Sequence, residues 1–168
     1  DIAYAARVSN PANQNSRETS EKLVRYLIKN NHWSPLEMVS VTMEIETTRD
    51  IARQILRHRS FSFQEFSQRY AEIDPTPMFK EARAQDTKNR QNSVRMEDGK
   101  IHKEQARAVL PEGITPSRLY MAGTIRSWAH FIQLRSGNGT QLEHQAIALE
   151  CAEALKPVFP MIEELISP

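Results

Sequence analysis

The hydrophobic period changes along the first third of the chain, and this change constrains the fold more than any other feature. Residues 17–30 carry apolar side chains at helical spacing, which predicts an amphipathic helix, and Ser34 is predicted to cap a short helix after it. Residues 39–46 alternate apolar and polar side chains, which predicts a strand with one buried face. Helical spacing returns over about residues 48–59. We therefore expect a single α+β domain, with a mixed or antiparallel sheet flanked by helices.

The second half of the chain repeats this alternation of elements. Residues 119–122 are compatible with a strand or a helix, and we favour a strand that ends before the following glycine. Thr124 is predicted to cap the helix that follows. Thr140 and Glu143 have the spacing of a capping box, which predicts the start of a last helix. Residues 80–105 are polar and almost without large apolar groups, and we expect a surface excursion or irregular loop there.

Length and composition narrow the class of protein. The 168 residues fit one compact domain over 1–168, and the net charge of +1 argues against a generally basic nucleic-acid coat protein. No apolar run is long enough to span a membrane and no signal-peptide pattern is present, so a cytoplasmic protein is expected. The single cysteine, Cys151, excludes an internal disulfide and a Cys-based zinc cluster. Because the chain begins at Asp1 in helix-like sequence, we expect that N-terminal residues are missing.

Although the net charge is nearly neutral, the basic residues are mostly arginine, with 15 Arg and 7 Lys. Positions 49, 53 and 57 share one face of the predicted helix, and a guanidinium holds phosphate or carboxylate with a rigid fork of N–H donors. The serines, carboxylate and aromatic rings that follow would suit a phosphorylated ligand that contains a ring. A solvated charged face beside a polar loop explains the same residues. Five arginines fall within 21 residues: Arg49, Arg53, Arg57, Arg59 and Arg69.

An ordered set of motifs decides between these interpretations. Arg57-His58-Arg59 is followed by Ser62, by Ser67 and by Arg69-Tyr70. This string resembles the defining motif of the flavin-dependent thymidylate synthases, in which Arg-His-Arg precedes Ser, Ser and Arg at fixed spacings. Further segments similar to that family follow its order through nearly the whole chain: residues 6–9, 32–37, 107–111, 126–127, 134–135 and 141–143.

The resemblance implies roles for particular residues. Flavin-binding residues are expected at Ser34, Arg57, His58, Arg59, Glu65, Thr124, Arg126 and His130. Nucleotide-binding residues are expected at Gln54, Arg57, Glu65, Ser67, Arg69, Arg107 and Arg135. Arg135, facing the pyrimidine ring, and Ser67 are the expected catalytic residues; Ser67 has no base near it by local spacing and is expected to hydrogen-bond the substrate rather than attack it. His32 and Tyr70 are expected on the folate side or in support of the site.

The same resemblance implies a reaction. It is the reductive methylation of dUMP to dTMP, with 5,10-methylenetetrahydrofolate as carbon donor, FAD as redox cofactor, NADPH as reductant and no metal. Members of the family are homotetramers with flavin sites between subunits. The single cysteine is consistent with this reaction. Other thymidylate synthases activate the uracil ring with a cysteine thiolate, whereas Cys151 lies among apolar residues and is expected to be a buried structural thiol. A flavin supplies redox chemistry without such a thiolate.

Arg135 has a physical task in such a reaction. Negative charge grows on the uracil ring when C5 becomes nucleophilic, and a fixed cation beside the ring stabilises it more than the resting substrate. A cation placed at a helix C-terminus by the helix dipole is the structural alternative.

The alternative function is nucleic-acid binding without catalysis. Phe61, Phe63, Phe66 and Tyr70 lie among arginines and would stack on bases. The net charge of +1 and the absence of a basic stripe elsewhere favour the enzyme, for which no nucleic-acid partner and no membrane contact are expected. The histidines lack the spacing of a His-Glu-x-x-His metal site.

Overall fold

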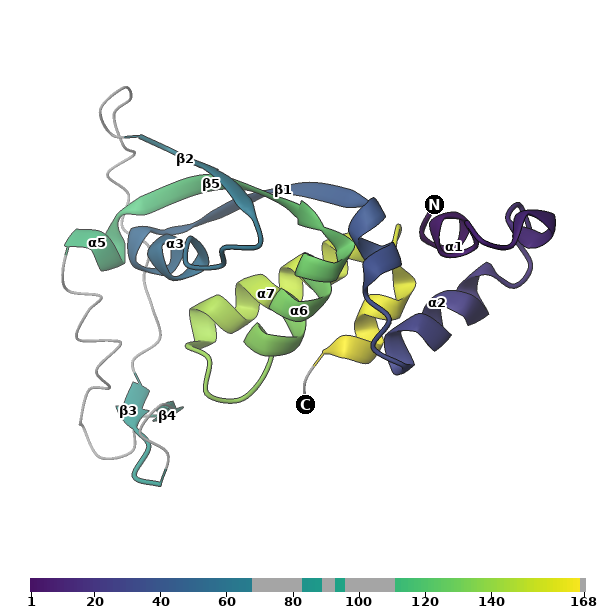
Figure 1. Ribbon diagram of the computed structural model, residues 1–168. Coiled ribbons are helices and arrows are strands. Elements are labelled where there is room, and N and C mark those ends of the chain that lie inside the picture. The colour runs from purple at the N-terminus through teal and green to yellow at the C-terminus, as the bar shows by residue number, and fades with distance from the viewer. Residues whose placement is uncertain (68–82, 89–92, 96–110, 167–168) are drawn as a thin grey trace.

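The computed structural model describes residues 1–67, 83–88, 93–95 and 111–166 (Figure 1). Arg69, Tyr70 and Arg107 lie outside the described residues. The helices are α1 (Ile2–Ala6), α2 (Ser20–Lys29), α3 (Arg49–Ile55), α5 (Pro111–Ile114), α6 (Ile125–Arg135) and α7 (Leu142–Leu155), with 3-10 turns η1 (Pro11–Asn13), η2 (Ser34–Met38) and η3 (Pro160–Leu165). The strands are β1 (Ser40–Thr48), β2 (Ser62–Glu65), β3 (Arg83–Gln85), β4 (Ser93–Arg95) and β5 (Pro116–Thr124).

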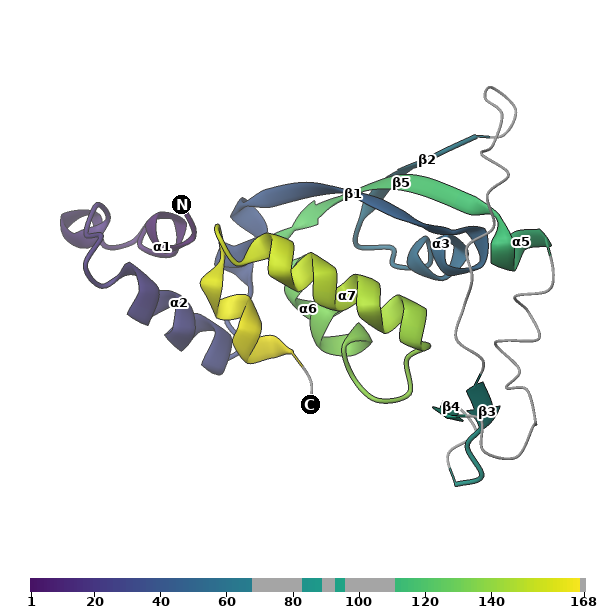
Figure 2. The ribbon, with the colours of Figure 1, turned by 180° about the vertical axis from the view of Figure 1, so that it is seen from behind.

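The central sheet has three antiparallel strands in the order β1-β5-β2, which confirms the antiparallel sheet of an α+β fold. In the register of β1 and β5, Ser40 lies opposite Thr124 and Thr48 opposite Pro116. Figures 1 and 2 show α3, α6 and α7 on the same face of this sheet. The helices cover one face because apolar and polar residues alternate along β1: Ile45 is buried, whereas its neighbours Glu44 and Glu46 are exposed.

A cluster of aromatic rings joins the sheet to α6. The Phe61 ring centroid lies 4.9 Å from that of Trp128, and Trp128 Nε1 donates to the carbonyl of Val41 at 3.1 Å. The predicted end of the strand before Gly123 is wrong, since β5 continues to Thr124. The glycine serves packing instead: a Cβ at Gly123 would lie 2.4 Å from Cδ1 of Phe61. Absence of a side chain therefore lets the Phe61 ring cross the strand.

The helix predicted over residues 48–59 ends at Ile55. After it, the amide of Arg57 donates to the carbonyl of Gln54 and the amide of His58 to that of Ile55, in tight turns that reverse the chain toward β2. The expectation that Arg49, Arg53 and Arg57 share one helical face is therefore wrong. Strand β2 was not predicted, because the polar segment from Ser62 to Glu65 pairs with β5, which is distant in sequence.

The predicted caps have different outcomes. Thr124 caps α6 as predicted, since its Oγ1 accepts from the amide of Ser127 at 3.3 Å. The cap predicted at Ser34 is wrong, because η2 begins at Ser34 itself, without a side-chain cap. The capping box of Thr140 is also wrong: Gln141 occupies the cap position of α7, and its side chain bonds to neighbouring side chains.

Residues 80–105 were expected to form a surface excursion or an irregular loop, and part of this segment forms two short strands. Its described parts, β3 and β4, pair as an antiparallel hairpin separate from the central sheet. Across the described ranges, every helix is too short or too polar to cross a membrane.

Candidate functional site

Two polar clusters lie at opposite ends of α6. The first, which we call the C-terminal cluster, contains Arg57, His58, Arg135 and His144, where the ends of α3 and α6 meet the start of α7. The second, the N-terminal cluster, contains Glu37, Thr124, Arg126, Ser127 and His130. Arg126 and Arg135 are separated by roughly 13 Å along the helix axis and by about half a turn around it. Within one chain, Arg126 and Arg135 therefore belong to two separate clusters.

Arg135 fixes the protonation of His58. The Nε–H of Arg135 donates to Nε2 of His58 at 3.0 Å, so this nitrogen carries a lone pair and the proton of the neutral ring sits on Nδ1. Burial and then the charge of Arg135 lower the pKa of His58 to about 4. At neutral pH the pair is a neutral imidazole with one N–H donor beside a guanidinium that retains further N–H donors.

His144 lies behind this pair and has no exposed surface. Its ring centroid is 6.1 Å from that of His58 and 5.8 Å from that of Phe131. Neither ring nitrogen has a hydrogen-bond partner among the residues that the structure describes. Burial, followed by the charges of Arg135 and His58, lowers the pKa of His144 to about 3. The ring is therefore neutral and adds no further positive charge beside the arginines.

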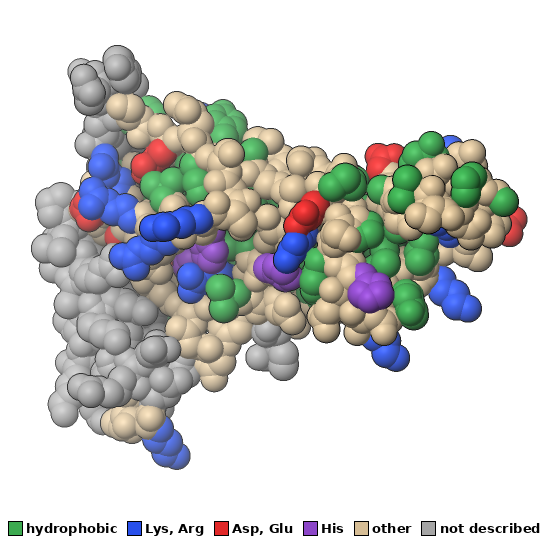
Figure 3. All heavy atoms as spheres, in the orientation of Figure 1, with side chains coloured by type: hydrophobic (Ala, Val, Ile, Leu, Met, Phe, Trp, Pro, Cys, Tyr) green, Lys and Arg blue, Asp and Glu red, His purple; other side chains and the backbone are tan. Residues whose placement is uncertain are grey.

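The arginines of the C-terminal cluster repel one another. Burial and then the charge of Arg57 lower the pKa of Arg135. In the described part of the chain, no carboxylate forms an ion pair with Arg57, Arg59 or Arg135. Figure 3 shows Lys and Arg side chains gathered over the region of α3 and α5. Other arginines are paired: Arg25 with Glu21 and Glu164, Arg53 with Glu112, Arg118 with Glu44 and Glu46, and Arg126 with Glu37.

A chain of side-chain amides borders the C-terminal cluster. Gln54 Nε2 donates to Oε1 of Gln141 at 2.8 Å, and Gln141 Nε2 donates to Oε2 of Glu143 at 2.9 Å. Gln54 was a predicted nucleotide ligand, whereas Gln141 was noted only within a family motif and Glu143 within that motif and the predicted capping box. Their role was missed because Gln54 and Gln141 are 87 positions apart in the sequence.

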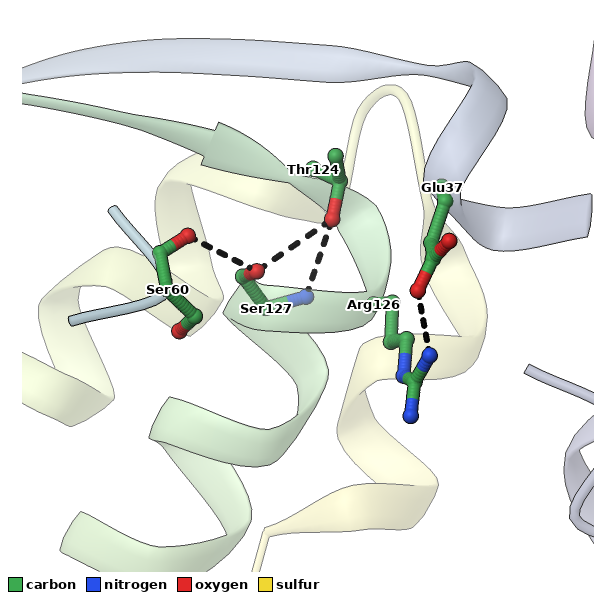
Figure 4. A network of polar contacts seen from close by, with 5 residues as sticks. All are labelled: Glu37, Ser60, Thr124, Arg126 and Ser127. Carbon is green, nitrogen blue, oxygen red and sulfur yellow. Dashed lines mark hydrogen bonds and ion pairs between the residues drawn. The ribbon is translucent and has the colours of Figure 1, made fainter. Parts of the chain in front are cut away.

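The N-terminal cluster is more open to solvent. Figure 4 shows Thr124 bonded to Ser127 at the start of α6, Ser127 Oγ donating to the carbonyl of Ser60, and Arg126 paired with Glu37. Arg126 and Glu37 are each about 40% exposed, so a ligand anion can reach the guanidinium. The positive end of the dipole of this eleven-residue helix also favours anions there.

A shallow pocket adjoins this cluster. It has a volume of about 480 Å³, and its lining includes His32, Trp33, Ser34 and Arg126. The ring of His130 packs edge-on against Trp33 with centroids 4.6 Å apart, and burial followed by the charge of Arg126 lowers the pKa of His130. Hydroxyl, guanidinium and aromatic groups thus surround one surface, which suits the phosphates and flat rings of a dinucleotide.

Comparison with known proteins places the chain among enzymes. A sequence profile described as thymidylate synthase complementing protein matches residues 1–161. A probable flavin-dependent thymidylate synthase of Paramecium bursaria Chlorella virus 1 is 46% identical, over 98% of this chain and 88% of the viral protein. A flavin-dependent thymidylate synthase of Synechocystis sp. is 44% identical, over 96% and 86% of the two chains. The chain belongs to this family. The resemblance drawn from the motifs is confirmed.

Solved structures share the fold of this family member. The UMP/dUMP methylase PolB from Streptomyces cacaoi, bound with 5-Br dUMP, superposes with a TM-score of 0.76 at 23% identity and covers 98% of this chain and 88% of its own. The same methylase bound with 5-Br UMP gives a TM-score of 0.72 at 26% identity, over 98% and 86% of the two chains. The fold class predicted for a flavin-dependent thymidylate synthase is confirmed.

The predicted site residues of this flavin-dependent thymidylate synthase fall into three groups. The structure brings Gln54, Arg57, His58 and Arg135 to one end of α6, and Ser34, Thr124, Arg126 and His130 to the other. Glu65 lies apart from both, at the end of β2, where its Oε1 accepts from Ser117 Oγ at 3.0 Å. Arg59 is exposed after α3, and Ser67 ends the described segment that follows β2. Arg69 and Arg107, both outside the described residues, stay predictions.

Cys151 lies in α7 as a buried thiol, as predicted. Burial and then Glu150 raise its pKa to about 12, so the sulfur is protonated and is a poor nucleophile at neutral pH. Among the residues with described positions, no group of three or more His, Cys, Asp or Glu side chains is arranged to hold a metal ion.

Proposed function

We propose that the protein catalyses the reductive methylation of dUMP to dTMP. The carbon donor is 5,10-methylenetetrahydrofolate, the redox cofactor is FAD and the reductant is NADPH. Membership of the family supports this reaction, as do relatives at 44–46% identity named for it. The structural neighbour PolB was solved with 5-Br dUMP bound, which supports a pyrimidine nucleotide as the substrate.

The guanidiniums of the C-terminal cluster, which have no carboxylate partner among the described residues, are the observation that carries the proposal. Arg57 and Arg135 lie close enough to repel each other, and His58 and His144 beside them are neutral. An anionic ligand relieves that repulsion, which gives binding energy for the nucleotide. Because Arg135 is held by His58, its remaining N–H donors are fixed in place for charge that develops on the uracil ring.

The residues of the N-terminal cluster fit FAD. Arg126, at the positive end of the α6 dipole, would hold its phosphates, and Trp33, Ser34 and His130 would line its rings. Bound FAD supplies the reducing equivalents of the reaction. Arg126 exchanges Glu37 for the incoming phosphate, so this arginine serves binding rather than chemistry.

The remaining predicted roles extend the same proposal. Ser67, Arg69 and Arg107 hold the sugar and phosphate of dUMP, and Glu65 contacts nucleotide and flavin together. We propose a homotetramer in which active sites lie between subunits. The separation of the two clusters along α6 supports it, because in such an assembly the flavin-binding end of one subunit can face the nucleotide-binding end of another.

A tritium-release assay tests the function. Purified protein is incubated with dUMP labelled at C5, methylenetetrahydrofolate, FAD and NADPH, and tritiated water is measured. Release that requires both FAD and reductant is the expected result. Protein that is colourless, takes up no added FAD and binds single-stranded nucleic acid with steep salt dependence would instead support the nucleic-acid-binding alternative.

A further inference from the structure

The amide chain from Glu143 to Gln54 has a direction. A carboxylate only accepts hydrogen bonds, so Gln141 must turn its NH₂ group toward Glu143. Its carbonyl oxygen then faces Gln54, which must in turn present its own NH₂ group to Gln141. The orientation of both amides is thus set by the charge of one glutamate at the start of α7.

Burial makes this direction firm. Gln141 is only 5% exposed. If its amide were reversed, its oxygen would face the Glu143 carboxylate and its NH₂ group would face the NH₂ group of Gln54, with little water to compensate. One atom of the chain is left over, the Oε1 oxygen of Gln54. No donor to it is found within the described part of the chain. Gln54 therefore offers an acceptor of fixed polarity at the edge of the C-terminal cluster.

We infer that Gln141 and Glu143 are positioning residues, which hold Gln54 so that its carbonyl oxygen accepts a hydrogen bond from an N–H or O–H donor of the nucleotide. This inference rests on the proposed function, which makes dUMP the ligand of the cluster. Two groups of dUMP donate hydrogen bonds, the N3–H of the uracil ring and the 3′-hydroxyl of the sugar. An amide locked in one orientation rejects a ligand in which that donor is replaced by an acceptor.

Two analogues make that replacement, one at each group. In dCMP the ring N3 is an acceptor, and in 2′,3′-dideoxy-3′-fluoro-UMP the fluorine cannot donate. The variant Glu143→Gln keeps the shape of the side chain but adds an NH₂ group, so the whole amide chain can reverse and present the NH₂ group of Gln54. Glu150→Gln is the matched control, because Glu150 is exposed on the same helix and loses the same charge.

The experiment measures dissociation constants of dUMP and both analogues for the FAD-loaded proteins by calorimetry. The wild type and Glu150→Gln are expected to bind dUMP alike and to bind one analogue about fivefold more weakly or worse. Glu143→Gln is expected to bind dUMP about fivefold more weakly than the wild type. The ratio of the dissociation constants of that analogue and dUMP is expected to fall severalfold in this variant. The KM for dUMP should rise while kcat changes little, and thermal unfolding by circular dichroism checks the fold.

The outcomes separate the two hypotheses. Narrowed discrimination against dCMP supports the inference with the ring N–H as the donor, and narrowed discrimination against the fluoro analogue supports it with the hydroxyl. Equal ratios in Glu143→Gln and Glu150→Gln for both analogues overturn it, while wild-type turnover leaves the proposed function standing. A wild-type protein that binds no dUMP overturns the proposed function, and the inference with it.

Discussion

The two ends of α6 carry the same kinds of side chain in opposite physical states. At its N-terminal end, Arg126 forms an exposed ion pair with Glu37, and the helix start is capped by Thr124. At its C-terminal end, Arg135 is partly buried, bonded to a neutral histidine and close to a second arginine. The first end resembles an ordinary stable helix terminus, whereas the second holds two neighbouring arginines that have no carboxylate partner among the described residues.

The difference separates holding from chemistry. An exposed, paired arginine exchanges partners easily, since the energy of a surface ion pair is small. A guanidinium in a drier site, oriented by a fixed hydrogen bond, interacts more strongly with charge that develops beside it. We therefore propose that the N-terminal cluster binds the flavin, and that the C-terminal cluster binds the nucleotide and stabilises its reacting ring. Each prediction below alters one end and leaves the other unchanged.

Arg135→Ala is expected to have the largest effect. Removing the oriented guanidinium should lower turnover by roughly a hundredfold, or about 3 kcal/mol of transition-state stabilisation, by analogy with loss of one oxyanion-hole donor. FAD should still bind, because the N-terminal cluster is intact. Tritium release and FAD titration measure the two effects, with Arg118→Ala on the exposed face of β5 as control. Normal turnover in Arg135→Ala would defeat the assignment.

His144→Leu is expected to stabilise the protein by about 1–3 kcal/mol at pH 7, because it removes buried nitrogens without a described partner. The folded-state pKa of about 3 lies below the usual value of 6.5, so the unfolded chain takes up the proton first as pH falls. Wild-type stability should therefore drop between pH 6.5 and 3, and the drop should be smaller in the leucine variant. Urea unfolding across that range measures both effects. A gain of equal size in His144→Gln, which keeps a buried polar group, would contradict this explanation.

Arg126→Ala tests the binding end. Loss of the guanidinium should weaken FAD binding about tenfold, equivalent to about 1.4 kcal/mol, and should leave dUMP affinity unchanged. Quenching of flavin fluorescence gives the FAD affinity. Glu37→Gln is the matched variant, because it frees the same arginine from its partner and should bind FAD at least as well as the wild type. Unchanged FAD affinity in Arg126→Ala would show that the two ends do not differ in this way.

Sequence reasoning predicted those parts of the molecule that depend on neighbouring residues. The period of β1 and the cap at Thr124 are local, and both were found. It failed where a distant segment decides the local structure. The polar segment at Ser62 is a strand because it pairs with β5, and Gln141, at the cap position of α7, bonds to Gln54, which is 87 positions away. In the candidate site, motif order supplied the candidate residues, which stay predictions, while the neutral state of His58 depends on burial and on Arg135, 77 positions away.

Thr124→Ala is expected to have the smallest effect and to separate a structural from a ligand-binding role. Thr124 was predicted as a flavin contact, yet its hydroxyl accepts from the amide of Ser127 and caps α6. Loss of such a cap lowers the free energy of unfolding by about 1 kcal/mol, and Thr124→Ser should restore most of it. FAD affinity should change less than twofold in both variants, because Arg126 and the helix amides remain. The contrary result would be a loss of FAD affinity in Thr124→Ala as large as in Arg126→Ala, with unfolding at the same urea concentration as the wild type. Thr124 would then be a ligand contact, and the N-terminal end of α6 would bind flavin through the Thr124 hydroxyl as well as the Arg126 charge.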